Sequence, residues 1–229
     1  MVLGSRAAMG YVLVRGAGAA AAQWWLSGGV SAANAIAVYQ PIGAASLAAS
    51  YTNLANPGTY DATAPGVAPN WTAADGWIFT GTQHVRQLIT FQQGYTFLIR
   101  FSNWTAQPIL NARDTVAAQF LYLLPSLGAP SNHYFQLGAA GRQFFTTPGI
   151  TSGVLGIAGN TAKCYRDGSY EGVVSSPQWQ QYPAYFAAQN FNGTAVGTFA
   201  STYIQAWAIY DTELSAAQIS AVSAAMAAL

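Results

Sequence analysis

Short stretches rich in β-branched, aromatic and other apolar residues follow one another along most of the chain. From residue 76 to residue 210 they recur about every 8–12 residues, with Gly, Pro or Asn between them. This rhythm is typical of an antiparallel β-sandwich or barrel, and no helix–strand alternation points to a parallel α/β sheet. The segments that we predict to be strands are AIAVYQP at residues 35–41, and then WIFTG, HVRQLITF, YTFLIRFSN, QPILNAR, QFLYLLP, NHYFQLG, RQFFTT, GVLGIAG, AKCYRDG, SYEGVVS, YFAAQN, TAVGTF and IQAWAIY.

The last segment of the chain has a different pattern. Ser215 followed three residues later by Gln218 matches a capping box, and the residues after it are rich in Ala. Apolar residues fall roughly on one helical face. We therefore expect an amphipathic helix near residues 215–227 that packs on the sheet through Leu214, Ile219, Val222 and Met226.

The first 34 residues are too short to bury a core of their own. We interpret residues 1–34 as an arm in intermolecular contact and residues 35–229 as the sandwich domain. The large apolar side chains of the arm would mediate assembly. The competing explanation is that the arm folds back as an extra edge strand. Arg15 interrupts a short apolar run, so we expect a retained N-terminus rather than a signal peptide. The proposed assembly residues are Tyr11, Leu13, Trp24 and Trp25.

Composition narrows the class of protein. Only 7% of the residues are charged and the net charge is +1, so no basic surface is available for nucleic acid. Such a surface is poorly protected against self-association, which favours partners that are copies of the same chain. No run of about 18 apolar residues predicts a transmembrane helix. Cys164 is the single cysteine and is expected to be a small buried residue.

Several motifs resemble one family. The segment YIQAWAIYDTELSAAQISAVSAA resembles the closing strand and helix of laminin-G-like, concanavalin A-like jelly-roll domains. CYRDGSYEG resembles the Tyr-x-Asp-Gly hairpin of that family, and GWIFTGTQHVRQ resembles its early Phe-x-Gly strand. The resemblance covers roughly residues 35–229 and implies an all-β, antiparallel jelly-roll β-sandwich with a short C-terminal helix.

The acidic residues argue against catalysis. Glucanases of this fold carry paired carboxylates on one strand, whereas no predicted strand here carries two acids two residues apart. Asp211 and Glu213 fall in the connection between strand and helix, where we expect turn and cap roles. His84 and His133 are expected to be structural. We therefore predict no enzyme activity and no catalytic residues.

Calcium and carbohydrate are the two ligands that the resemblance brings into question. Rim calcium would use Asn111, Asp114, Asn160, Asn190 or Asn192, but one carboxylate per loop makes a tight site unfavourable, so no cofactor is expected. Sugar binding uses aromatic platforms beside amides and hydroxyls. The polar, aromatic segment of residues 175–185 is the best candidate, although its rings could instead pack on the sandwich or on a neighbouring copy. The candidate residues are Asn103, Trp104, Trp179, Tyr182 and Tyr185.

Three functions follow from these observations. The first is a non-enzymatic structural protein on a virion, such as a bacteriophage decoration component, with copies of itself and other particle proteins as partners. The second is a carbohydrate-binding module of a secreted or cell-surface protein, with glycans as partners. The third is a glycoside-cleaving enzyme. The fold alone does not decide among them.

Overall fold

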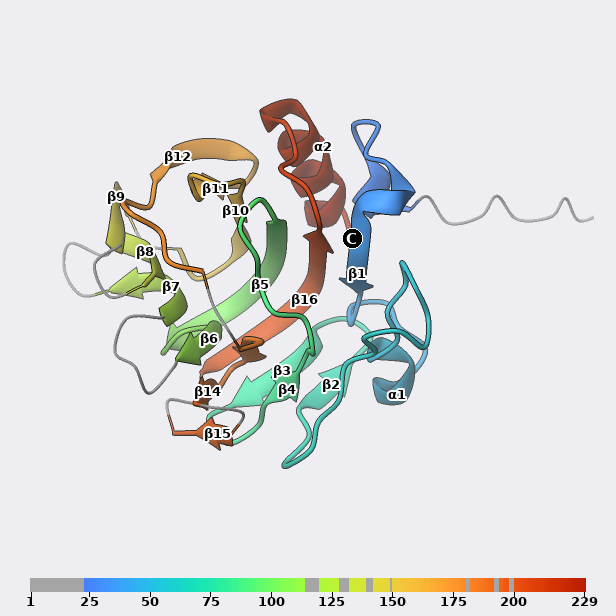
Figure 1. Cartoon of the computed structure of the whole chain (residues 1–229). Coiled ribbons are helices and arrows are strands. Elements are labelled where there is room, and N and C mark those ends of the chain that lie inside the picture. The colour runs from blue at the N-terminus through green and yellow to red at the C-terminus, as the bar shows by residue number, and fades with distance from the viewer. Residues whose placement is uncertain are drawn as a thin grey trace, which may run out of the picture.

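The computed structural model contains two β-sheets that face each other, with a helix on the outer side of one of them (Figure 1). The architecture is a mostly antiparallel β-sandwich, as the spacing of the apolar stretches predicts. The structure describes residues 23–113, 120–127, 132–138, 142–148, 150–179, 182–191, 194–197 and 200–229.

The first sheet, sheet A, is built around the last strand of the chain. β16 (Ser201–Tyr210) pairs along one side with β5 (Thr96–Ala106). Its other side pairs with β1 (Ala35–Tyr39) at the C-terminal half and with β3 (Gly76–Thr80) at the N-terminal half. The remaining strands are β2 (Asn70–Thr72), β10 (Gly153–Ala158), β11 (Lys163–Arg166) and β12 (Ser169–Val173).

The second sheet, sheet B, follows the order β15-β14-β6-β7-β8-β9. The short strand β13 joins β4 to β6, and β14 runs parallel to β6, whereas the other described pairs are antiparallel. The strands are β4 (Val85–Arg86), β6 (Leu110–Arg113), β7 (Phe120–Leu127), β8 (Asn132–Leu137), β9 (Arg142–Pro148), β13 (Tyr185–Phe186), β14 (Gln189–Phe191) and β15 (Thr194–Val196).

Every stretch predicted as a strand contains one. Some strands are shorter than predicted, and one strand was not predicted. HVRQLITF forms a strand only at Val85–Arg86, and residues 87–91 leave the sheet. The three-residue strand Asn70–Thr72 was not predicted, because it is too short to show alternation inside a turn-rich segment. The same turn-rich segment contains one short helix, α1 (Leu47–Ser50), which begins at the Ser46 N-cap.

Aromatic side chains fill the space between the two sheets. Phe186 of sheet B lies 5.6 Å from the ring of Trp77 and 5.0 Å from that of Trp207, both in sheet A. All three rings are fully buried. Edge-to-face and tilted ring contacts of this kind add about 0.5–1.5 kcal/mol each beyond area burial, so Phe186 helps to hold the sheets together.

The C-terminal helix α2 (Ala216–Ala227) covers the outer face of sheet A (Figure 1). The predicted capping box is present, since the Ser215 and Gln218 side chains each bond the backbone of the other residue. At the other end, Arg100 Nη1 donates to the Met226 carbonyl at 3.0 Å, where a cation is favoured by the helix dipole. The predicted apolar face is buried: Leu214, Ile219, Val222 and Met226.

Trp24 and Trp25 also pack on this outer face. They form the 3₁₀ turn η1 (Trp24–Leu26), which contacts α2 and is buried in the same apolar cluster. The Tyr210 hydroxyl donates to the Trp25 carbonyl at 2.8 Å. A second 3₁₀ turn, η2 (Ala32–Asn34), leads into β1. The two rings expected to contact a neighbouring copy are thus covered by their own chain, while Tyr11 and Leu13 lie outside the described residues.

The predicted hairpin between β11 and β12 is confirmed. Asp167 and Gly168 have φ angles of 48° and 81°, so both central residues are left-handed, as a tight two-residue turn requires. A side chain at Gly168 would place its Cβ 2.9 Å from the Ser220 Cα. The hairpin therefore also depends on glycine for its contact with α2.

Candidate functional site: the polar face of sheet B

The outward side of sheet B carries polar side chains, because core and non-core residues alternate along its strands. In β6, Leu110 and Ala112 belong to the core between the sheets, which leaves Asn111 and Arg113 on the other side. The same alternation operates in β4, β7, β8 and β13. We call the resulting surface the polar face, and it contains Arg86, Asn111, Tyr122, Gln136, Tyr185 and Gln189.

Strand register brings these residues into one row across the sheet. Tyr185 is paired with Arg86 on one side and with Asn111 on the other, and Asn111 is paired in turn with Tyr122. Gln189 also lies beside Asn111, across the parallel pair. Directly paired residues on one face have Cβ atoms only about 4.5–5.5 Å apart, so the row is continuous.

A hydrogen-bond network joins the middle of the row. Gln189 Nε2 donates to the Tyr122 hydroxyl at 2.7 Å and lies 3.4 Å from Asn111 Oδ1. Asn111 is fully buried, yet its Nδ2 has no hydrogen-bond partner in the described part of the chain. A buried donor without a partner costs about 1–3 kcal/mol, so this amide group is only partly satisfied.

Tyr185 lies between Arg86 and Asn111 in the row. Its ring stacks against His84, with the ring centres 5.7 Å apart, and the Arg86 guanidinium lies 5.2 Å from the ring centre. Burial lowers the pKa of His84, and the nearby Arg86 charge lowers it further. At neutral pH the site therefore offers a neutral imidazole, a guanidinium and phenol and amide groups.

The structure separates the predicted sugar-binding residues. Tyr185 lies on the polar face, but it is 1% exposed, so its ring is enclosed rather than an open platform. Trp104 belongs to the core, and its indole N–H donates to the Gln107 carbonyl at 2.7 Å. Asn103 is exposed on β5 in sheet A. These residues therefore do not form one surface, and their contact with glycans stays a prediction.

The predicted segment of residues 175–185 borders sheet B. Gln178 N–H donates to the Leu137 carbonyl at the end of β8, and Asn190 Nδ2 donates to the Pro183 carbonyl at 2.6 Å. Trp179 is half-buried and packs against the core, and Tyr182 is also half-buried. Of this segment, Tyr185 is the residue that the register places on the polar face.

The acidic side chains of the described residues lie away from the polar face. Glu213 forms a 2.7 Å ion pair with Lys163, and Asp211 is an exposed residue at the end of β16. We expected Glu213 to act on the helix dipole, but its carboxylate instead lies over Gly159, where an added Cβ would come within 2.1 Å of the carboxyl carbon. Asp114 lies outside the described residues.

The described residues contain neither a cluster of potential metal ligands nor a membrane-spanning helix. Among them, no three His, Cys, Asp or Glu side chains gather into a potential metal site. Of the residues considered for calcium, Asn111 and Asn190 lie in sheet B, Asn160 is exposed, and Asp114 and Asn192 are not described. In the same part of the chain, no helix is long and apolar enough to cross a membrane.

Sequence reasoning missed four members of the polar face as binding groups. Their strands were predicted, but nothing marked which side of each strand faces the core. The four residues are Arg86, Tyr122, Gln136 and Gln189. The signal that could have found them is a polar residue between apolar ones, as in the segment LNAR and its partner FLYLL, where apolar residues flank Asn111 and Tyr122. Neither segment predicts which of its residues pair with those of the neighbouring strand.

No known protein family matches the sequence, nor does any curated protein. Solved structures do resemble it. Domain 4 of AbnA, a GH43 extracellular arabinanase from Geobacillus stearothermophilus in complex with arabinotriose, has a TM-score of 0.58 and 15% identity. The likeness covers 83% of this chain and 98% of that domain.

Two further likenesses involve larger proteins. A mutant of Trypanosoma rangeli sialidase that displays trans-sialidase activity has a TM-score of 0.59 and 13% identity over 86% of this chain. Botulinum neurotoxin type C, whose cell entry depends on two ganglioside molecules, has a TM-score of 0.56 and 10% identity over 85%. This chain spans 34% of that sialidase chain and 52% of that neurotoxin chain. The predicted resemblance is confirmed for the β-sandwich fold, the only property that likeness at such low identity shows.

Proposed function

We propose that this chain is a carbohydrate-binding domain whose glycan contacts lie on the polar face of sheet B. The observation that carries the proposal is the buried amide of Asn111, which has an unpartnered donor beside the Gln189–Tyr122 hydrogen bond. Amides, phenols and a guanidinium are the groups that recognise sugar hydroxyls, because they donate and accept in fixed directions.

The solved structures support this proposal over a virion role. The similar arabinanase domain holds arabinotriose, and the similar neurotoxin interacts with gangliosides. The likeness to the arabinanase domain covers 98% of that domain, so an independent unit is the relevant comparison. The expectation of a virion component assembling in many copies stays a prediction.

Binding rather than cleavage is favoured by the composition of the polar face. Glycoside cleavage needs two carboxylates on either side of the scissile bond. The described residues of the polar face supply none, and Glu213 is already paired with Lys163 elsewhere. The proposed activity is therefore recognition of a glycan without chemical change.

A binding assay with a matched pair of variants tests the proposal. The probes are arabinotriose, a ganglioside headgroup oligosaccharide and a printed panel of neutral and acidic glycans. Tyr122→Phe removes the hydroxyl that accepts from Gln189 and should weaken binding about 2–12-fold, the equivalent of one hydrogen bond. Tyr170→Phe, on an exposed tyrosine of β12, should leave binding unchanged.

Two results would contradict the proposal. The first is wild-type protein that binds no glycan in the panel. The second is a folded Tyr122→Phe variant, with an unchanged melting temperature, that binds as wild type and is matched by an Asn111→Leu variant that does the same.

A further inference from the structure

The polar face carries positive charge as well as amide and phenol groups. Arg86 lies on β4, one strand away from Tyr185 and two strands away from Asn111. Arg113 follows Asn111 by two residues on β6, so it lies on the same side of the sheet, with the two Cα atoms about 7 Å apart. Both arginines are partly exposed, whereas Asn111 is fully buried. A ligand on this face therefore meets two guanidinium groups beside one buried amide.

Arg86 is held in place by aromatic contacts. Its guanidinium carbon lies 5.2 Å from the centre of the Tyr185 ring, within the range of a cation–π contact. That ring is stacked in turn on His84, which is buried and packs on another side against Gly66, where an added Cβ would come within 3.1 Å of the His84 Cε1. A guanidinium held over a ring keeps its N–H donors around the edge of its own plane. Arg86 can therefore bond a ligand without first losing much rotamer freedom.

The backbone around Arg86 is fixed as well. Arg86 N–H donates to the Thr63 carbonyl at 2.7 Å, and the Arg86 carbonyl accepts from Thr63 N–H at 3.0 Å. On its other side Arg86 is paired with Tyr185. The fully buried Gln87 side chain donates to the Ala184 carbonyl at 3.0 Å, which ties the two strands together next to this pair. These bonds fix Arg86 relative to the rest of the row before any ligand arrives.

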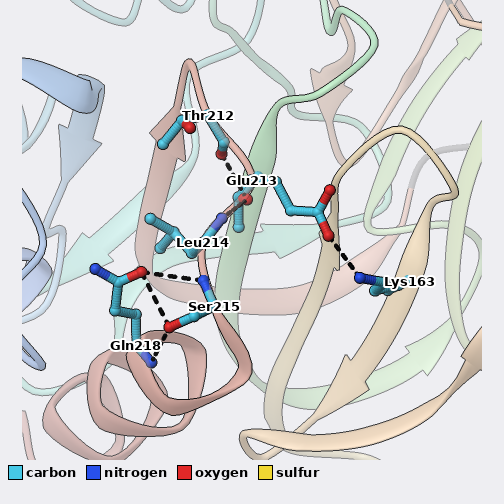
Figure 2. Close-up of polar contacts among 7 residues, drawn as sticks. Lys163, Thr212, Glu213, Leu214, Ser215 and Gln218 are labelled. Atoms are coloured by element: carbon cyan, nitrogen blue, oxygen red, sulfur yellow. Dashed lines mark hydrogen bonds and ion pairs between the residues drawn. The ribbon is translucent and has the colours of Figure 1, made fainter.

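The carboxylates of the described residues lie elsewhere. Figure 2 shows the Glu213 side chain turned toward Lys163, whose Nζ lies 2.7 Å from the Glu213 Oε1. Glu171 pairs in the same way with Arg166, at 3.2 Å, at the edge of sheet A. The remaining described carboxylates lie in loops and turns outside the strands, and they belong to Asp61, Asp75, Asp167 and Asp211. The charged groups that the described polar face offers to a ligand are therefore guanidinium groups, which favour an anion.

We propose that the polar face selects glycans that carry a carboxylated sugar, either a uronic acid or a sialic acid. The carboxylate of the ligand accepts hydrogen bonds from the Arg86 guanidinium, whose planar fork matches a carboxylate, and a neighbouring sugar hydroxyl accepts from Asn111 Nδ2. Arg113 adds a second positive charge on the same face and favours the same ligands. The inference rests on the proposed function for the location of the site, and it adds the class of ligand.

Binding of the full chain to matched pairs of oligosaccharides tests the selectivity. One pair is trigalacturonic acid and the same trisaccharide with its carboxyl groups reduced to hydroxymethyl groups. The other pair is sialyllactose and its uncharged carboxamide. In titration calorimetry the wild type should bind the acidic member of at least one pair about tenfold or more tighter than the neutral member, because charge-assisted hydrogen bonds are roughly twice as strong as neutral ones. The pair that shows the difference identifies the acidic sugar.

A second measurement tests the role of Arg86. Arg86→Gln removes the guanidinium and should weaken binding of the acidic member about tenfold or more, to the level of its neutral partner. The matched control is Arg166→Gln, which removes one positive charge from sheet A and should leave both affinities unchanged. Melting curves of both variants check that they are folded. If Arg86→Gln does not fold, the wild-type comparison of the ligand pairs decides alone.

The outcomes separate the selectivity from the proposed function. Equal binding of the acidic and neutral members by the wild type overturns the selectivity and leaves the carbohydrate-binding function standing. The selectivity is also overturned if folded Arg86→Gln retains it in full, or if Arg166→Gln reduces it as much. Absence of any binding by the wild type, both to these pairs and to the wider glycan panel, overturns the proposed function together with the selectivity.

Discussion

The outward faces of the two sheets differ in polarity. That of sheet A is apolar, with Val38, Leu98 and Val154 buried beneath α2 and η1. That of sheet B carries Asn111, Tyr122 and Gln189, and the buried Asn111 Nδ2 has no partner among the described residues. Burying an apolar face stabilises a fold, whereas an unsatisfied buried amide destabilises it. Sheet A therefore stabilises the domain through its covered outer face, whereas the outer face of sheet B contains an unsatisfied group, as expected for the proposed binding site.

The largest effect is expected where sheet A is covered. Ile219 of α2 is fully buried against this face. Ile219→Ala removes three carbons without allowing the helix to close the gap, and it should lower the free energy of unfolding by about 2–5 kcal/mol in urea denaturation. Ser220→Ala, on the exposed side of the same helix, should stay within about 0.5 kcal/mol of wild type. Similar values for both variants would show that α2 is only loosely attached.

An intermediate effect of opposite sign is expected on sheet B. Asn111→Leu removes the unpartnered donor and should leave the free energy of unfolding unchanged or raise it by up to about 2 kcal/mol, while glycan binding weakens. Asn53→Leu is the matched control, because that amide is equally buried but fully bonded. It should destabilise by at least about 3 kcal/mol, since several backbone groups lose their partner.

The stabilities of Asn111→Leu and Asn53→Leu test whether the outward faces of the two sheets differ in this way. If Asn111→Leu destabilises the protein as much as Asn53→Leu does, Asn111 is a structural residue. The polar face would then have no special claim to bind a ligand.

The smallest effect is expected from pH. The pKa of His84 is lowered in the folded protein by burial and by Arg86, so below about pH 6.5 the unfolded chain binds the proton more readily. Stability should therefore fall as the pH falls below that value. A series of melting temperatures from pH 7.5 to 5 should show a smaller fall for His84→Gln than for wild type. Parallel curves for the two proteins would show that protonation of His84 does not destabilise the folded protein.

The local elements could be predicted well because their signals are local. The capping box of Ser215 and Gln218, and the left-handed pair Asp167-Gly168, are set by residues within four positions of each other. The apolar face of α2 follows from helical spacing alone. The burial of Trp24 and Trp25 against α2 could not be predicted, because an aromatic pair in an Ala-rich segment indicates burial without indicating the surface that buries it.

The sequence by itself therefore determined the secondary structure, the sandwich class and the scarcity of charge. Only the tertiary structure decided which residues share a surface. Asn111 meets Gln189 across 78 positions through strand register. Register is fixed by the packing of the whole core, because a slip of one residue would turn every side chain to the other face. No short motif contains that information, and so the polar face was not visible until the sheets were formed.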